Sequence, residues 1–356
     1  MFYYSNNRKL MFSNRIEALN NDSPFSFYYF DNEFNKVSWT EEPTESLPDL
    51  YRQRAEQLRQ DYEYLILAYS GGSDSHNILE TFYYNNIHID EILLVGAFSQ
   101  DSNKGDENHN GEIYNMAIPT ISKLKFPNTK ITTFDYTTLF SDINNFSLIK
   151  KYGDDWIYHI GSFYSVHNLF WNDLKQLIGK NNDKNTGIIF GFEKPNYKWD
   201  FNRKAAYTAF SDLGVTSYGN FQKEDNFERV CFYSDPKAEK IIRKQLHVIN
   251  NFFIEKCLNK NNPTLLYSNY SKIINKLVYF PKNPILYTSP KSPTNILSIR
   301  DSYILNKKNS DIYKMYIAGI KKFPANYINV KREVDSFFSM SSFLSKRYYI
   351  TNTLNV

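Results

Sequence analysis

One stretch near residue 70 constrains the fold more than any other part of the chain. The run YLILAY, residues 64–69, is apolar over the length of a buried strand. It leads into the polar loop SGGSDS, residues 70–75, and then into HNILETFYYNN, residues 76–86, which has the pattern of a helix. A strand that is apolar on both faces and turns directly into a helix is typical of a parallel sheet covered on two sides.

Apolar strands and helical segments continue to alternate after this stretch. Further strands are expected in the segments IDEILLVGAF, TKITTFDY and TGIIFGF. A helix is expected ahead of the first strand, in LPDLYRQRAEQLRQDY, where apolar residues recur at helical spacing. We therefore predict an α/β domain over residues 61–200, with a parallel sheet of the five-stranded type and helices on both of its faces.

The segments on either side of this domain have different patterns. Residues 1–60 alternate aromatic residues with Asn and Asp clusters, which predicts a small piece of β-hairpins before the lead-in helix. Residues 201–356 are expected to be mainly helical, and PKAEKIIRKQLHVINNFFIEKCL, residues 236–258, is the clearest amphipathic helix.

Composition excludes several classes of protein. No stretch approaches the roughly 18 apolar residues that span a bilayer, and the first residues lack the apolar core of a secretory signal. We therefore expect a cytoplasmic protein without a membrane partner. The only cysteines, Cys231 and Cys257, are too few for a disulfide framework and lack metal-ligand spacing, so we expect buried thiols.

Positive charge is concentrated toward the C-terminus. The whole chain has a net charge of +4, but residues 281–356 hold twelve Lys and Arg against four Asp and Glu, a net charge of +8. Dispersed lysines commonly form only a solvated face. This segment is also a candidate nucleic-acid contact, because Lys and Arg bind the phosphate backbone.

The chemistry of the loop at residues 70–75 suits a phosphate group. Its glycines let backbone N–H groups approach oxygen atoms closely, and the N-terminus of the following helix favours negative charge. Ser70 and Ser75 add hydroxyl donors. The loop lacks the Gly-Lys-Ser/Thr of the Walker A type, whose lysine serves the β and γ phosphates, so cleavage of a different phosphate bond is implied.

The segment LILAYSGGSDS resembles the SGGxDS signature of the N-type ATP pyrophosphatases, the PP-loop superfamily. This resemblance implies an adenine nucleotide alpha hydrolase-like fold that binds ATP and Mg²⁺, with the loop holding the departing pyrophosphate. It implies that Asp74 orients the loop or holds the metal. His76 departs from the signature, which usually has Ser or Thr at that position. The implied nucleotide-binding residues of this segment are Tyr69, Ser70, Gly71, Gly72, Ser73, Asp74 and Ser75.

Within that superfamily, the first 255 or so residues resemble the synthetase domain of asparagine synthetase. ILLVGAF is similar to its second strand, which implies adenine contacts at Val95 and Gly96. NTGIIFGFEKP stands where that family has a second Gly-rich acidic loop, which implies that Gly191 approaches the nucleotide. Glu193 and Lys194 replace the usual acidic pair there and are candidate catalytic residues. Lys194 is placed to neutralise charge that develops on the α-phosphoryl group.

A second resemblance concerns the segments GFEKP and CFYSDPKAEKIIRKQLHVI. They are similar to asparagine-synthase-like PP-loop proteins of bacteriophages, which implies a location in the host cytoplasm. The glutaminase domain of asparagine synthetases needs an N-terminal cysteine, whereas Phe2 follows Met1 here. Glutamine hydrolysis is therefore not expected.

These features predict an ATP-dependent ligase that forms AMP and pyrophosphate. It would adenylate a carboxylate or carbonyl oxygen, and a nitrogen nucleophile would then displace AMP. Lys244 and His247, three residues apart on the amphipathic helix, are candidate substrate contacts. Two alternatives stay open: modification or thiolation of a nucleic-acid base by a PP-loop enzyme, and a nucleotide-binding module without turnover.

Overall fold

The structure is a computed structural model. It describes residues 2–5, 10–12, 18, 25–96, 98, 113–135, 151–159, 171–179, 183–191, 196–212, 226–258, 270–279, 311–322, 328–331, 337–340 and 344–351.

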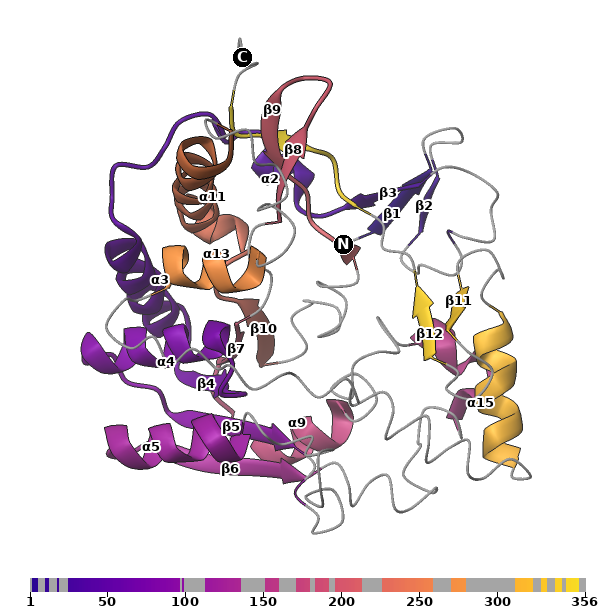
Figure 1. Ribbon diagram of the computed structural model, residues 1–356. Helices are drawn as coiled ribbons and strands as arrows, with labels where there is room; N and C mark the ends of the chain where they lie inside the picture. The colour runs from indigo at the N-terminus through magenta and orange to yellow at the C-terminus, as the bar shows by residue number, and fades with distance from the viewer. Residues whose placement is uncertain are drawn as a thin grey trace.

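The largest sheet of the described residues, which we call the central sheet, has five parallel strands and lies at the lower left of Figure 1. All four strand pairings are parallel, and the strands nearest the middle are almost wholly buried, as their apolar composition requires. The predicted α/β fold with a five-stranded parallel sheet is therefore confirmed. In the spatial order β10-β7-β4-β5-β6, the strands are β10 (Phe227–Cys231), β7 (Thr186–Phe190), β4 (Tyr64–Ala68), β5 (Glu91–Gly96) and β6 (Lys130–Asp135).

The strand order places a topological switch point beside the central strand. From β4 the chain adds β5 and then β6 on one side, and it later adds β7 and then β10 on the other side. Crossovers between parallel strands are right-handed, so connections that run in opposite directions across the sheet cover opposite faces. Ligands of such sheets bind outside the carboxyl ends of the strands at the switch point, which here lies between β4 and β7.

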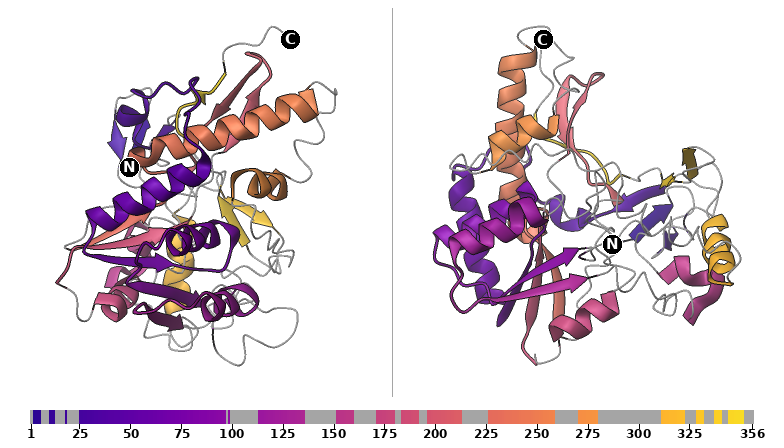
Figure 2. Two further views of the ribbon diagram at one scale, coloured as in Figure 1. Left: turned by 90° about the vertical axis from the view of Figure 1, so that its left-hand side faces the viewer. Right: turned by 60° about the horizontal axis from the view of Figure 1, so that its bottom comes forward.

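The helices near the sheet include α3 (Leu47–Asp61), α4 (Ser73–Tyr84), α5 (Ile118–Leu124) and α9 (Trp171–Gly179). The N-cap of α3 is Ser46, whose Oγ accepts the Asp49 N–H at 3.3 Å, and Pro48 occupies a first-turn position where its missing N–H costs nothing. The apolar face of α3 packs against α4 and against α11 (Glu239–Phe253), which lies over α3 (Figure 2).

Two small antiparallel sheets contain the strands nearest the two ends of the chain. The N-terminal sheet has the order β2-β1-β3, with β1 (Phe2–Ser5), β2 (Met11–Phe12) and β3 (Phe25–Tyr28). The other has the order β13-β9-β8, with β8 (Tyr197–Asp200), β9 (Ala205–Thr208) and β13 (Tyr348–Tyr349). Phe34, in the short helix α2 (Asp31–Phe34), packs between them. Its ring centre lies 5.1 Å from that of Phe210 and 5.9 Å from that of Tyr348.

The region after residue 200 contains more strand than we predicted. Its described α-helices are α11, α13 (Tyr270–Val278) and α15 (Asp311–Lys321), and β11 (Ile328–Lys331) pairs with β12 (Phe337–Met340) in an antiparallel sheet. The fifth strand of the central sheet, β10, also falls in this region, and the β8–β9 hairpin straddles residue 200. The strand signal of β10 is weak because Glu228 and Arg229 interrupt its apolar run at the sheet edge.

Candidate functional site

The loop between β4 and α4 leaves the carboxyl end of the central strand. The Tyr69 N–H still donates to the carbonyl of Leu93 at 2.9 Å, so the sheet holds the loop up to that point. Gly71 has a φ of 82°, a left-handed conformation that disfavours any side chain. Gly72 is the N-cap of α4, which therefore begins at Ser73, three residues earlier than predicted. Because no side chain caps α4, its first amides are the donors that an anion would meet here.

Serine hydroxyls give the loop at residues 70–75 a fixed shape. The Ser75 hydroxyl donates to the carbonyl of Gly72 at 3.1 Å and accepts the Ser70 N–H at 3.3 Å. The two serine hydroxyls also share a hydrogen bond of 3.2 Å, and the Gly72 N–H donates to Ser70 Oγ at 3.2 Å. Ser70 is exposed, so its hydroxyl lies at the solvent side of a preformed turn.

Gly191 follows β7 and packs directly against the first turn of α4. A Cβ on this residue would lie 2.8 Å from the Ser75 nitrogen and 3.0 Å from the Asp74 carbonyl carbon, so a larger residue would displace the backbone. Val95 and Gly96 end β5, on the other side of β4. The loop, Gly191 and the end of β5 therefore all lie at the carboxyl ends of neighbouring strands. Glu193 and Lys194 lie outside the described residues.

Two tyrosines from distant segments hold Asp74. The Tyr233 hydroxyl donates to the Asp74 backbone carbonyl at 2.8 Å, and the Tyr279 hydroxyl donates to Asp74 Oδ1. Burial raises the pKa of both hydroxyls well above the usual tyrosine value, so both remain O–H donors at neutral pH. Neither tyrosine was predicted, because 159 and 205 residues separate them from Asp74 and the chain has 29 tyrosines without a distinguishing motif.

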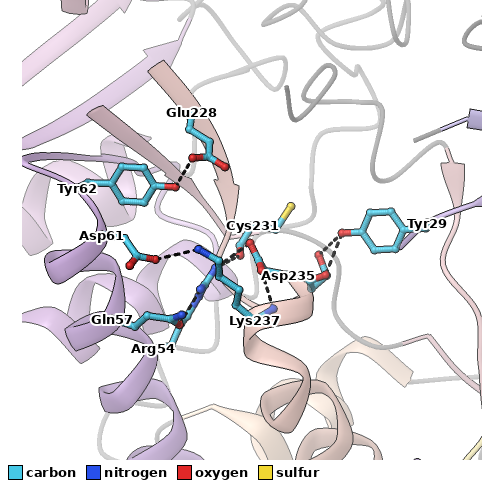
Figure 3. Close-up of polar contacts among 10 residues, drawn as sticks. Tyr29, Arg54, Gln57, Asp61, Tyr62, Glu228, Cys231, Asp235 and Lys237 are labelled. Carbon is cyan, nitrogen blue, oxygen red and sulfur yellow. Dashed lines mark hydrogen bonds and ion pairs between the residues drawn. The ribbon is translucent and has the colours of Figure 1, made fainter. Parts of the chain in front are cut away.

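The turn that carries Tyr233 is anchored to α3 and to Tyr29, the residue after β3 (Figure 3). Arg54 is buried and donates through Nη2 to the Cys231 carbonyl at 3.1 Å, and the same nitrogen lies 3.1 Å from Asp235 Oδ2. The Tyr29 hydroxyl donates to the Ser234 carbonyl at 3.0 Å. Tyr233 therefore approaches Asp74 from a fixed turn. The Cys231 thiol is buried, as predicted, and the side chain of Cys257 is outside the described part.

His76, the departure from the signature, forms a buried polar group behind the loop. Its Nδ1 shares a hydrogen bond of 2.9 Å with the Tyr69 hydroxyl, and its Nε2 lies 3.5 Å from Oε1 of Glu80, one turn further along α4. All three side chains are buried. The His76 ring therefore packs behind the loop in the core and does not face the solvent side of the site.

Lys244 and His247 are engaged away from the 70–75 loop. The Lys244 ammonium lies 2.7 Å from Glu42 Oε1 and donates to the Pro43 carbonyl at 3.0 Å. His247 Nε2 donates to the Trp39 carbonyl at 3.0 Å. Both residues fix the chain between α2 and α3 onto α11, so the structure does not bring their polar groups to the loop.

Part of the basic C-terminal segment is neutralised internally. Lys322 pairs with Asp154 and Asp155, Lys314 lies 3.0 Å from Asp311, and Arg347 lies 2.9 Å from Asp200 Oδ2.

Among the described residues, no helix has both the length and the apolar character needed to cross a membrane.

Within the same described ranges, no group of three or more His, Cys, Asp or Glu side chains is arranged to hold a metal ion. Asp74 contributes one carboxylate beside the first turn of α4. Mg²⁺ in nucleotide sites commonly uses one or two protein carboxylates together with phosphate oxygens. The donor set of the loop therefore fits a magnesium-bound polyphosphate better than a free metal ion.

Comparison with models of known protein families gives no match for this chain. Comparison with curated protein sequences gives no match either. The function of the site is therefore inferred from its residues and from the resemblance of its loop to the PP-loop signature.

Proposed function

We propose that the chain is an AMP-forming PP-loop enzyme that binds ATP and Mg²⁺ at the 70–75 loop. The α-phosphorus of ATP would be attacked by a carboxylate or carbonyl oxygen of an acceptor, with loss of pyrophosphate. A nitrogen nucleophile would then attack the adenylated carbon and release AMP. This is the amide-forming chemistry of the asparagine synthetases, whose synthetase domain the sequence resembles.

One observation carries the proposal: a glycine-rich turn with uncapped helix amides lies at the switch point of a parallel sheet. The turn supplies backbone and hydroxyl donors but no lysine, which suits retention of a departing pyrophosphate more than transfer of a terminal phosphoryl group. Gly191 supports the same reading because only a glycine lets the end of β7 pass beside the loop.

Different residues would bind the phosphates, the adenine and the metal ion. The first amides of α4 and the Ser70 hydroxyl would bind phosphate oxygens, and the end of β5 would contact the adenine. Mg²⁺, when bound, would neutralise charge on the pyrophosphate, and Asp74 would hold it. Lys194 remains the candidate for stabilising charge on the α-phosphoryl group.

A nucleic-acid acceptor is the second candidate, and one surface favours it. On the sheet β13-β9-β8 the guanidinium of Arg203 lies 4.8 Å from the ring centre of Tyr349, and that of Arg347 lies 4.8 Å from the ring centre of Tyr207. Exposed Lys204 and Lys346 belong to the same sheet region. Tyr207 is buried and Arg347 is paired with Asp200, so the exposed cations Arg203, Lys204 and Lys346 are the groups that would contact phosphates.

We expect Gly191→Ala to weaken ATP binding about tenfold or more, because its Cβ would push the Ser75 amide out of place. Isothermal titration calorimetry with ATP and Mg²⁺ measures this change. Gly187→Ala, within the preceding strand β7, is the matched control: its Cβ would meet the Tyr62 ring at 2.7 Å, away from the loop. Both variants should lose stability by overpacking, but only Gly191→Ala should lose ATP affinity. Equal ATP affinities for the two variants would contradict a nucleotide site at this loop.

Reaction products test the chemistry itself. With α-labelled ATP, Mg²⁺ and a working acceptor, the labelled product should be AMP, with pyrophosphate as its partner. The acceptor panel should include amino acids with ammonium and, for the second candidate, tRNA. Formation of ADP as the main product would contradict the PP-loop mechanism, and ATP binding without turnover would favour the module without catalysis.

A further inference from the structure

Helix α13 places two side chains, one turn apart, on adjacent residues of the 70–75 loop. Asn275 Nδ2 donates to Ser73 Oγ at 2.9 Å, and the Tyr279 hydroxyl donates to Asp74 Oδ1. The Tyr279 N–H donates to the Asn275 carbonyl at 3.1 Å, so the helical path continues through Tyr279. Residues four positions apart lie on one helix face, and this face of α13 is directed at the start of α4.

A neighbouring side of α13, about a quarter-turn away, is fixed in the core. Ile274 and Val278 are each 1% exposed. The Tyr51 hydroxyl, on α3, donates to the Val278 carbonyl at 2.6 Å, and Gln245 Nε2, on α11, donates to the same hydroxyl at 2.8 Å. The position of α13 relative to the loop is therefore set by two other helices.

Three tyrosine rings connect this anchor to Asp74. The ring centres of Tyr51 and Tyr279 each lie 5.8 Å from that of Tyr233. Tyr233 holds the Asp74 backbone and Tyr279 holds its carboxylate. The backbone and the carboxylate of Asp74 are thus both held by residues more than 150 positions away in the chain.

We propose that Tyr279 and Asn275 are positioning residues of the ATP site: Tyr279 orients the Asp74 carboxylate for Mg²⁺, and Asn275 orients the Ser73 hydroxyl. This rests on the proposed function. A carboxylate accepts several partners, so a hydrogen bond to Oδ1 is compatible with holding a metal. Hydrogen bonds to a metal-binding carboxylate fix its direction, and their loss typically weakens metal binding 10–100-fold.

The test uses Tyr279→Phe, which keeps the ring beside Tyr233 and removes only the hydroxyl. The measurement is the rise in melting temperature of the full chain at fixed ATP while Mg²⁺ is titrated. The Mg²⁺ concentration for half of the maximal rise should increase about tenfold. ATP affinity measured by calorimetry without Mg²⁺ should stay within about twofold of the parent, because the backbone donors remain.

Tyr62→Phe is the matched control. Its hydroxyl also donates to a carboxylate, Glu228 Oε2 at 2.7 Å, but at the opposite end of the sheet (Figure 3), so its Mg²⁺ dependence should equal that of the parent. An unchanged Mg²⁺ dependence in Tyr279→Phe would overturn the positioning role while the proposed function stands. Absence of ATP binding by the parent would overturn both.

A second variant tests the same helix face if Tyr279→Phe does not fold. Asn275→Ala should raise the dissociation constant of ATP about fivefold, the effect of one neutral hydrogen bond. Parent affinity in a folded Asn275→Ala would overturn the role of α13.

Discussion

Arg54→Ala is expected to lower the free energy of unfolding by about 3 kcal/mol. The Arg54 side chain is 2% exposed, and its guanidinium bonds the Cys231 carbonyl, Asp235 and Gln57. Removing it leaves the carboxylate of Asp235, itself 25% exposed, without this partner. Loss of one member of a buried ion pair costs roughly 3–5 kcal/mol, and we take the lower end because water reaches Asp235.

Arg52→Ala is the matched control, two positions away on the same helix. Its side chain is 41% exposed and pairs with Asp49 and Glu56, which are 53% and 45% exposed. Such surface pairs contribute at most about 1 kcal/mol, and the change in helix propensity is the same in both variants. Urea unfolding of the three proteins gives the comparison. Similar midpoints for Arg54→Ala and the parent would mean that the turn after β10 does not depend on this arginine.

The central part of the fold could be predicted because its signals are local. β4, β5 and β7 are short continuous apolar runs, and α3 has both an N-cap serine and apolar residues at helical spacing. Glycines at positions 71 and 72 marked the turn before α4. The start of α4 was predicted three residues too late, because Ser73, Asp74 and Ser75 are polar yet form its first turn.

The surroundings of the loop could not be predicted because they arise from contacts between distant segments. Nothing local in the sequence distinguishes Tyr233 or Tyr279 from the other tyrosines, and their role depends on the turn after β10 and on α13 reaching Asp74. Lys244 was predicted to contact a substrate only because of its position on the helix. That face is covered by the segment before α3, and an ion pair with Glu42 uses its charge.

Asp74→Asn is expected to slow formation of AMP by ~10² or more, if the proposed function holds, because the carboxylate charge that would hold Mg²⁺ is lost. The substitution removes the negative charge of the side chain but keeps its shape and its hydrogen-bond acceptor. Asparagine keeps an Oδ1 acceptor for the Tyr279 hydroxyl, and the backbone carbonyl that Tyr233 bonds is unchanged. The variant should therefore fold, with a urea midpoint close to that of the parent.

Chromatography of α-labelled ATP under saturating ATP and Mg²⁺ measures the rate directly. Asp61→Asn is the control, since it makes the same chemical change in a partly exposed carboxylate that pairs with Lys237 away from the loop. That variant should react at the parent rate, because a surface pair of this kind contributes little to structure. Parent rates in Asp74→Asn would show that its charge does not act in the reaction, and the loop would then bind phosphate through its amides and hydroxyls alone. A normal midpoint combined with the ~10²-fold loss would assign the effect to the charge of Asp74, since the hydrogen bonds from Tyr233 and Tyr279 can still form.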